Sequence, residues 1–168
     1  MRASMYSLSI PVFRRTLTNL SAILDKAAKH AEARKIDPSV LLAARLYPDM
    51  FTFTRQVQLA SDFAKGTAAR LAGEAPPKFD DVEVSFAELK ERIARTIALL
   101  DRFKPEQLDG SEQRDIELKS PDRTLRFKGL DFLAHWALPH FFFHVTTAYD
   151  ILRHNGVEVG KQDFLGPV

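Results

Sequence analysis

The sequence predicts an all-α protein: a four-helix bundle with a short β-hairpin or extended excursion between its third and fourth long helices. Three observations support this fold class. Four long segments repeat apolar residues at steps of three and four, helix-starting and helix-stopping residues flank these segments, and residues 115–127 alternate apolar with polar residues instead. Because 168 residues with 45% hydrophobic and 27% charged side chains suffice for one sizeable core, we expect a single domain over residues 1–168.

The first long helix is expected over about Ser7–Arg34. Apolar side chains recur along it with helical spacing from Phe13 onward, and Pro11 suits a first turn, where the missing N–H costs nothing. The dipeptide DP that comes after it is an N-cap and first-position signal. We therefore expect a short helix over about residues 37–46, which Pro48 interrupts.

The second and third long helices are separated by a proline-containing stretch. The second should run from Phe53 to Gly73, because glycine is a natural C-terminal stop. The sequence GEAPPKFDDVEV has two prolines and mixed polarity, which indicates an extended connection. SFAE, from Ser85 to Glu88, is a capping box, and the apolar face behind it predicts a third helix that ends before Pro105.

Residues 115–127, DIELKSPDRTLRF, alternate apolar and polar side chains around SPDR, which suits a turn. They are the predicted hairpin or excursion. The fourth long helix should begin near Gly129 and end at the C-cap pair Asn155 and Gly156. Pro139 lies inside it, removes one backbone hydrogen bond, and should kink the helix.

Composition excludes several classes of function. The formal net charge of +2 comes from 24 basic and 22 acidic residues that alternate along the chain without a Lys/Arg cluster, so we expect no nucleic-acid partner. The chain has no cysteine, which excludes disulfides and thiolate chemistry and fits a reducing compartment. There is no 18-residue apolar run and no signal-peptide pattern, so we expect a cytoplasmic protein with no membrane partner.

Four of the five histidines lie in HWALPHFFFHVTTAYDILRHNG, on the fourth predicted helix. His140 and His144 are four residues apart on an inward-facing stripe, so their imidazoles could chelate one small cation. A catalytic zinc site needs three protein ligands, and the inward stripe of the second helix offers Asp49 and Gln56 as polar candidates. We assign no catalytic residue, because no GxSxG, P-loop or GxGxxG motif occurs.

A four-helix bundle with HxxxH late in its last helix, followed by AYDILRHNG, resembles the DinB-like superfamily of small bacterial proteins, and one of its branches of unknown function in particular. The likeness covers nearly the whole chain and is carried by PVFRRTLTNLSAILDKA, ARLYPDMFTFTRQVQLASDFAKG and HFFFHVTTAYDILRHNGVEVGKQDFLG. It implies a divalent metal such as Zn, Ni or Fe, held by one histidine of the second helix and two of the fourth, often in a homodimer. His140 and His144 match the fourth-helix pair, whereas the second helix has no histidine, and Gln56 or Asp49 occupies the neighbourhood of the third ligand.

Two functions remain open. The preferred one is a homodimer that is non-catalytic or binds a small molecule in its histidine pocket, with a vestigial or incomplete metal site. The alternative is a divalent-metal-dependent hydrolase or thiol transferase, activities that the resemblance implies for some members, in which His140 and His144 hold the cation together with Asp49 or Gln56. Aromatic residues of the FFF run at 141–143 and of the first helix are expected to supply the apolar face of the dimer.

Overall fold

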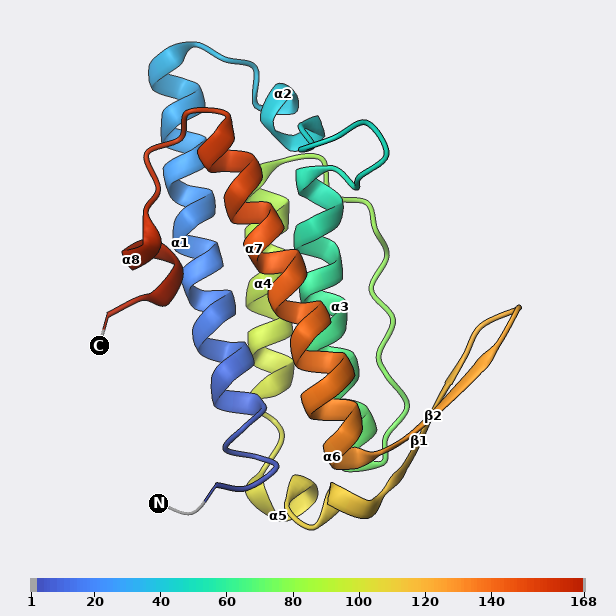
Figure 1. The fold of residues 1–168 in the computed structure, drawn as a ribbon. Coiled ribbons are helices and arrows are strands. Elements are labelled where there is room, and N and C mark those ends of the chain that lie inside the picture. Colours follow the sequence, from blue (N-terminus) through green and yellow to red (C-terminus); the bar gives the residue numbers. More distant parts are fainter. Residues whose placement is uncertain (1–2, 168) are drawn as a thin grey trace.

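The computed structural model describes residues 3–167 and is mostly helical, with one two-stranded antiparallel hairpin. Its longest helices are α1 (Ile10–Arg34), α3 (Phe53–Ala72), α4 (Phe86–Leu100) and α7 (Leu138–His154). These four lie side by side around a common core, and the hairpin projects from one end of them (Figure 1). In the described part of the chain, no helix is both long and apolar enough to cross a membrane.

Helices α1 and α2 begin and end on local signals. α1 starts three residues later than expected, because a turn held by the Ser9 hydroxyl, which donates to the Met5 carbonyl at 2.6 Å, precedes it. α2 spans Pro38–Ala43, and the Asp37 carboxylate caps it by accepting from the Ser39 amide at 2.9 Å. It also ends about three residues earlier than expected, because Ala44 is already extended.

The start of α4 and the end of α3 match the predicted signals. Gly73 closes α3 with a φ of 80°, a conformation that glycine adopts without strain. At α4, the Ser85 hydroxyl accepts from the Glu88 amide at 3.2 Å, and the Glu88 carboxylate accepts from the Val84 amide at 2.7 Å. α4 ends before Pro105, as predicted, and a short helix α5 (Pro105–Leu108) that periodicity did not predict comes next.

The connection from Gly73 to Ser85 is extended, as predicted, and runs beside α3 for much of its length (Figure 1). Arg92 of α4, whose side chain is 0% exposed, fixes it in place. Its guanidinium donates to the Glu83 carboxylate and to the Asp80 carbonyl, each at 3.0 Å, and pairs with Asp81 at 2.9 Å. The connection is thus anchored by a buried charge rather than by apolar packing alone.

The predicted hairpin is confirmed. β1 (Asp115–Lys119) comes after a short 3-10 turn, η1 (Ser111–Gln113), and pairs with β2 (Thr124–Lys128) in antiparallel register. Ile116 faces Phe127 across the ladder and Leu118 faces Leu125, so the apolar side chains of both strands share one face. Ile116 on this face is buried in the core, and Leu118 and Phe127 pack against it.

The last long helix is continuous but not uniform. It begins as α6 (Gly129–Phe132), widens into a π-helical turn, η2 (Leu133–Ala137), and continues as α7 to His154. In the wide turn the Leu138 amide donates to the Leu133 carbonyl, five residues back, immediately before Pro139. The irregularity that Pro139 predicted therefore takes the form of a π-turn next to the histidine pair.

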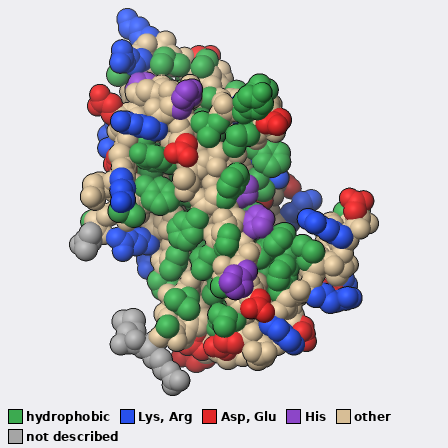
Figure 2. Space-filling view, viewed as in Figure 1, with side chains coloured by type: hydrophobic (Ala, Val, Ile, Leu, Met, Phe, Trp, Pro, Cys, Tyr) green, Lys and Arg blue, Asp and Glu red, His purple; other side chains and the backbone are tan. Residues whose placement is uncertain are grey.

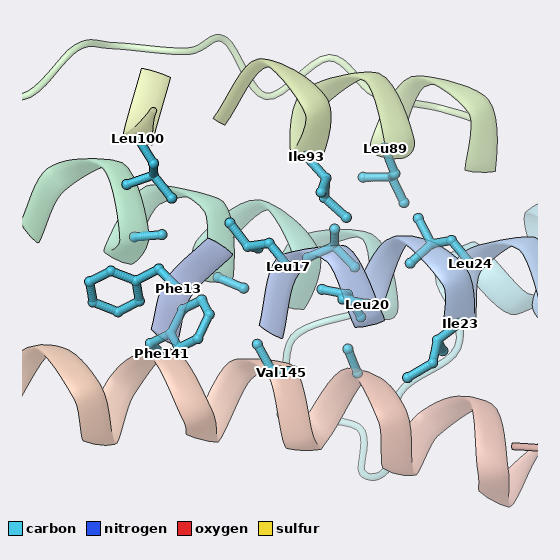
Figure 3. Close-up of a cluster of buried hydrophobic side chains, with 14 of the residues drawn as sticks. Phe13, Leu17, Leu20, Ile23, Leu24, Leu89, Ile93, Leu100, Phe141 and Val145 are labelled. Carbon is cyan, nitrogen blue, oxygen red and sulfur yellow. The ribbon is translucent and has the colours of Figure 1, made fainter. Parts of the chain in front are cut away.

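The core lies between the long helices. Figure 3 shows Leu89 and Ile93 of α4 pointing toward α1, while Phe13 of α1 lies against Phe141 of α7. The two phenylalanine rings meet edge to face at 4.8 Å, and both are 0% exposed. The expectation that the first helix offers an exposed aromatic residue is therefore wrong, because Phe13 is its aromatic residue and belongs to the core. A further short helix that was not predicted, α8 (Lys161–Leu165), packs on the outside of α1.

Candidate functional site

His140 and His144 lie one turn apart on α7, on the side that packs against α3. His144 is buried, at 7% exposure, and His140 is half-buried. Both imidazoles therefore turn toward the neighbouring helix, as the sequence predicted. Figure 2 shows histidines set among hydrophobic side chains on the face that α7 presents in Figure 1.

The protonated nitrogen of each imidazole is fixed by its partner. Nδ1 of His140 lies 2.7 Å from the Trp136 carbonyl oxygen, and Nδ1 of His144 lies 2.8 Å from Oε1 of Gln56. The Gln56 amide is itself oriented, because its Nε2 donates to the Phe51 carbonyl at 3.4 Å. Since both partner oxygens can only accept, each Nδ1 carries a proton and donates it to its partner.

Aromatic rings surround the pair. Phe63 of α3 stacks on both imidazoles, with centroid distances of 4.7 Å to His140 and 5.5 Å to His144. Trp136 lies 4.2 Å from the His140 ring, and Phe143 meets the His144 ring edge-on at 5.4 Å. The two imidazoles thus lie among aromatic rings of α3, η2 and α7.

Burial, with smaller contributions from the positive charges of His140 and Arg55, lowers the pKa of His144 to about 4. His144 is consequently uncharged at neutral pH, with an unprotonated Nε2. A lone-pair donor of this kind can accept a hydrogen bond or ligate a metal ion.

This pKa predicts how stability depends on pH. Between pH 6.5 and about 4 the unfolded chain takes up a proton at this imidazole while the folded chain does not, so stability should fall as the pH is lowered, by roughly 3 kcal/mol. Urea unfolding across this window, with EDTA present, measures the slope. The His144→Gln variant should show a flatter slope, and equal slopes in the two proteins would contradict the assignment.

The third ligand position is not filled by a carboxylate or a histidine. Gln56 is buried at 1% exposure, but its oxygen accepts from His144 and so serves as an anchor for the imidazole. Asp49 lies in the exposed turn before α3, three residues ahead of the cap Thr52, and is not on the helical stripe that the sequence suggested. Within residues 3–167, no group of three or more His, Cys, Asp or Glu side chains could hold a metal ion. The ligand set that the resemblance implies is therefore not assembled.

Sequence reasoning singled out the histidine pair and Gln56 but missed Phe63. The signal was present, because Gln56 and Phe63 are seven residues apart and so share one face of α3. Trp136, which closes the other side of His140, was missed because the π-turn places it there and no periodicity predicts a π-turn.

Comparisons with known proteins agree with this architecture. A family model described as a domain of unknown function, DUF1993, matches residues 5–165. The chain is also similar to a solved structure, a DinB family member protein from Shewanella denitrificans, with 44% identity and a TM-score of 0.88 over 97% of this chain and 92% of that one. A comparison with the curated proteins finds no match.

Proposed function

We propose that this chain, which belongs to the DUF1993 family of DinB-like domains of unknown function, is a non-catalytic four-helix-bundle protein that binds a small molecule at its histidine pair. One observation carries the proposal. Gln56, which lies where a third metal ligand is expected, is engaged in holding His144 by its Nδ1–H at 2.8 Å. The metal site is therefore incomplete, while the imidazoles are rigidly placed.

The proposed ligand binds in the hollow of about 380 Å³ bordered by Pro139, His140, Phe143 and His144. Its walls are almost wholly apolar, and the two Nε2 atoms have no protein partner among the described residues. A pocket of this size, with apolar walls and a few fixed polar atoms, is typical of small-molecule sites. The chemistry favours an uncharged molecule that brings one or two N–H or O–H donors to the imidazoles.

We further propose that the functional unit is a homodimer that covers this hollow. Phe143, which borders it, is 55% exposed, and the segment before α3, whose Phe51 carbonyl accepts from Gln56, carries Phe51 at 57% and Tyr47 at 65%. Aromatic residues are enriched in protein interfaces, so a second copy is a suitable cover. Light scattering at tens of micromolar should give twice the mass of the chain, and a monomer would contradict this part of the proposal.

One observation favours the alternative, a divalent-metal-dependent hydrolase or thiol transferase. Histidines that ligate metals usually donate their second ring N–H to a carbonyl or carboxylate, as both His140 and His144 do here. Two imidazoles alone fall short of the three protein ligands of a catalytic zinc site, however, and Asp49 is not beside them. The metal-dependent activity is therefore the alternative function.

Metal content separates the two functions. We expect protein purified without a His tag to carry Zn, Ni or Fe at well below one ion per chain, and to carry the same amount in the His144→Ala variant. Elemental analysis measures this, and His154→Ala, which changes an exposed histidine at the end of α7, is the matched control. One ion per chain in the wild type, lost in His144→Ala and kept in His154→Ala, would establish the metal site instead, and the ion should then also stabilise the fold.

A further inference from the structure

A second hollow, of about 320 Å³, lies between α3, η2 and β1, at the end of the bundle where the hairpin joins. Its apolar walls are Leu59, Phe63, Leu118, Phe132 and Trp136. None of the four residues that border the histidine hollow belongs to it. The two hollows therefore differ in their bordering residues, although Phe63 and Trp136 of this one also lie against the His140 ring.

One guanidinium gives this hollow its charge. Arg70 lies seven residues beyond Phe63, on the same face of α3, and is half-buried. Its Nη1 donates to the Gly66 carbonyl at 3.1 Å, and within residues 3–167 no carboxylate lies within ion-pairing distance of it. Burial lowers the pKa of Arg70, but an arginine stays protonated at neutral pH.

The acidic side chain at the wall does not neutralise Arg70. Asp62 borders the hollow, but its Oδ1 already pairs with Lys65 and with Arg92, each at 2.8 Å. Among the described residues, Arg70 is therefore the cation at this hollow that pairs with no carboxylate. A half-buried cation without a counter-ion loses hydration that an anionic ligand would restore.

A second polar group at the wall also lacks a partner. Thr67 is 1% exposed, borders the hollow, and its Oγ1 makes no hydrogen bond with any described residue. In a helix, a threonine hydroxyl often bonds the carbonyl four residues back, and here it does not. Its Oγ1 is enclosed in the wall and not open to the hollow, so Arg70 is the polar group that an anionic ligand can reach.

We propose that this hollow binds a small apolar carboxylic acid, whose aryl or branched alkyl body packs between Phe63 and Trp136 while its carboxylate pairs with Arg70. The planar guanidinium fork matches a carboxylate in shape and charge. A single arginine among apolar walls suits one negative charge on an otherwise hydrophobic molecule better than a phosphate, whose hydration these walls would not replace. The volume lies in the range of small-molecule sites.

The experiment uses the chain's one tryptophan, Trp136, as its reporter, because it lines the hollow. The full-length protein is titrated with 4-phenylbutyrate and, separately, with the neutral 4-phenylbutyramide, while tryptophan fluorescence is followed. We expect a saturable change with the acid and an affinity about 10 to 100 times weaker for the amide, the difference that a charge-assisted hydrogen bond makes.

Variants assign the effect to Arg70. Arg70→Met should reduce the affinity for the acid to that for the amide and leave amide binding unchanged, while Arg70→Lys, which keeps the charge but not the fork, should still prefer the acid. Arg34→Gln, which changes an exposed arginine on α1 that contributes nothing to the hollow, should bind as the wild type does. Circular dichroism confirms that each variant is folded.

Three results would overturn the proposal: no saturable change with the acid, equal affinity for acid and amide, or equal losses in Arg70→Met and Arg34→Gln. Binding of the acid in the His144→Ala variant separates this site from the histidine pair. We expect that binding to be unchanged, and its loss would place the acid at the histidines instead. The metal analysis bears only on the histidine pair, so either proposal can fail alone.

Discussion

Replacement of Arg92 by methionine is expected to lower the free energy of unfolding by about 3–5 kcal/mol, the usual cost of removing one partner of a buried ion pair. The Arg92 side chain is 0% exposed, and it pairs with Asp62 at 2.8 Å, Asp81 at 2.9 Å and Glu83 at 3.0 Å. Methionine fills much of the same space but leaves these carboxylates without their shared cation. It also releases the Asp80 carbonyl, so the extended connection should loosen.

Arg95→Met is the matched control for urea unfolding. Arg95 lies three residues further along α4, is exposed, and stacks over Phe79 of the same connection with a cation-to-centroid distance of 4.3 Å. A cation–π contact at an exposed site contributes about 0.5–1 kcal/mol, so this variant should lose little stability. Losses of similar size in the two variants would show that the buried ion network contributes no more than surface stacking.

The Arg92 effect should itself depend on pH. Burial alone would raise the pKa of Glu83, but hydrogen bonds from Arg92 and Gln58 outweigh it and hold that pKa below its ordinary value of 4.5. The stability that this carboxylate contributes is present above pH 4.5 and is lost as the pH falls through its lower folded pKa. The gap in stability between wild type and Arg92→Met should therefore narrow in acid, where Glu83 is protonated in both proteins.

The parts of the fold that the sequence predicts well are those with local causes. Asp37 and Ser85 cap their helices by bonding amides two or three residues away, and Gly73 stops α3 by its own backbone conformation. Alternation within thirteen residues sufficed for the hairpin. Because cause and effect lie within a few residues in each case, they can be recognised in the sequence.

The parts that the sequence does not predict have distant causes or too few residues to show a pattern. Helices α5 and α8 have four and five residues, about one turn each, so no periodicity can reveal them. Arg92 pairs with Asp62, which is thirty residues away in the sequence. No pattern in the residues around either one predicts this pair. Long-range electrostatic pairing depends on the assembled fold and not on local spacing.

At the candidate site, too, the sequence predicts a residue correctly where the cause is local. The inward position of Gln56 is a consequence of helical periodicity, and the structure places it at 1% exposure against His144. The prediction for Asp49 extended the same helical periodicity to residues before α3. Asp49 lies in a turn there, so the helical repeat does not apply to it. The cap residue Thr52 marks the true start of α3, so a cap should bound any stripe from which ligands are inferred.

The second large effect is expected in the FFF run, where three consecutive residues turn by about 100° each and so meet different surroundings. Phe141 is 0% exposed and packs edge to face on Phe13, whereas Phe143 is 55% exposed beside the histidine hollow. Phe141→Ala should therefore lower the free energy of unfolding by about 3–5 kcal/mol, because it leaves a cavity in the core. Phe143→Ala should change the stability of the single chain by about 0.5 kcal/mol or less.

Measurements at several protein concentrations test whether Phe143 lies in a dimer interface. If a second copy covers it, Phe143→Ala should weaken association in light scattering and reduce the dependence of the unfolding midpoint on protein concentration, because an interface stabilises by mass action. Phe141→Ala should lower the midpoint at every concentration, since its cavity lies within one chain. A large loss for Phe143→Ala in dilute, monomeric protein would show instead that this side chain packs inward, and the hollow beside His144 would then have no exposed aromatic rim for a partner to cover.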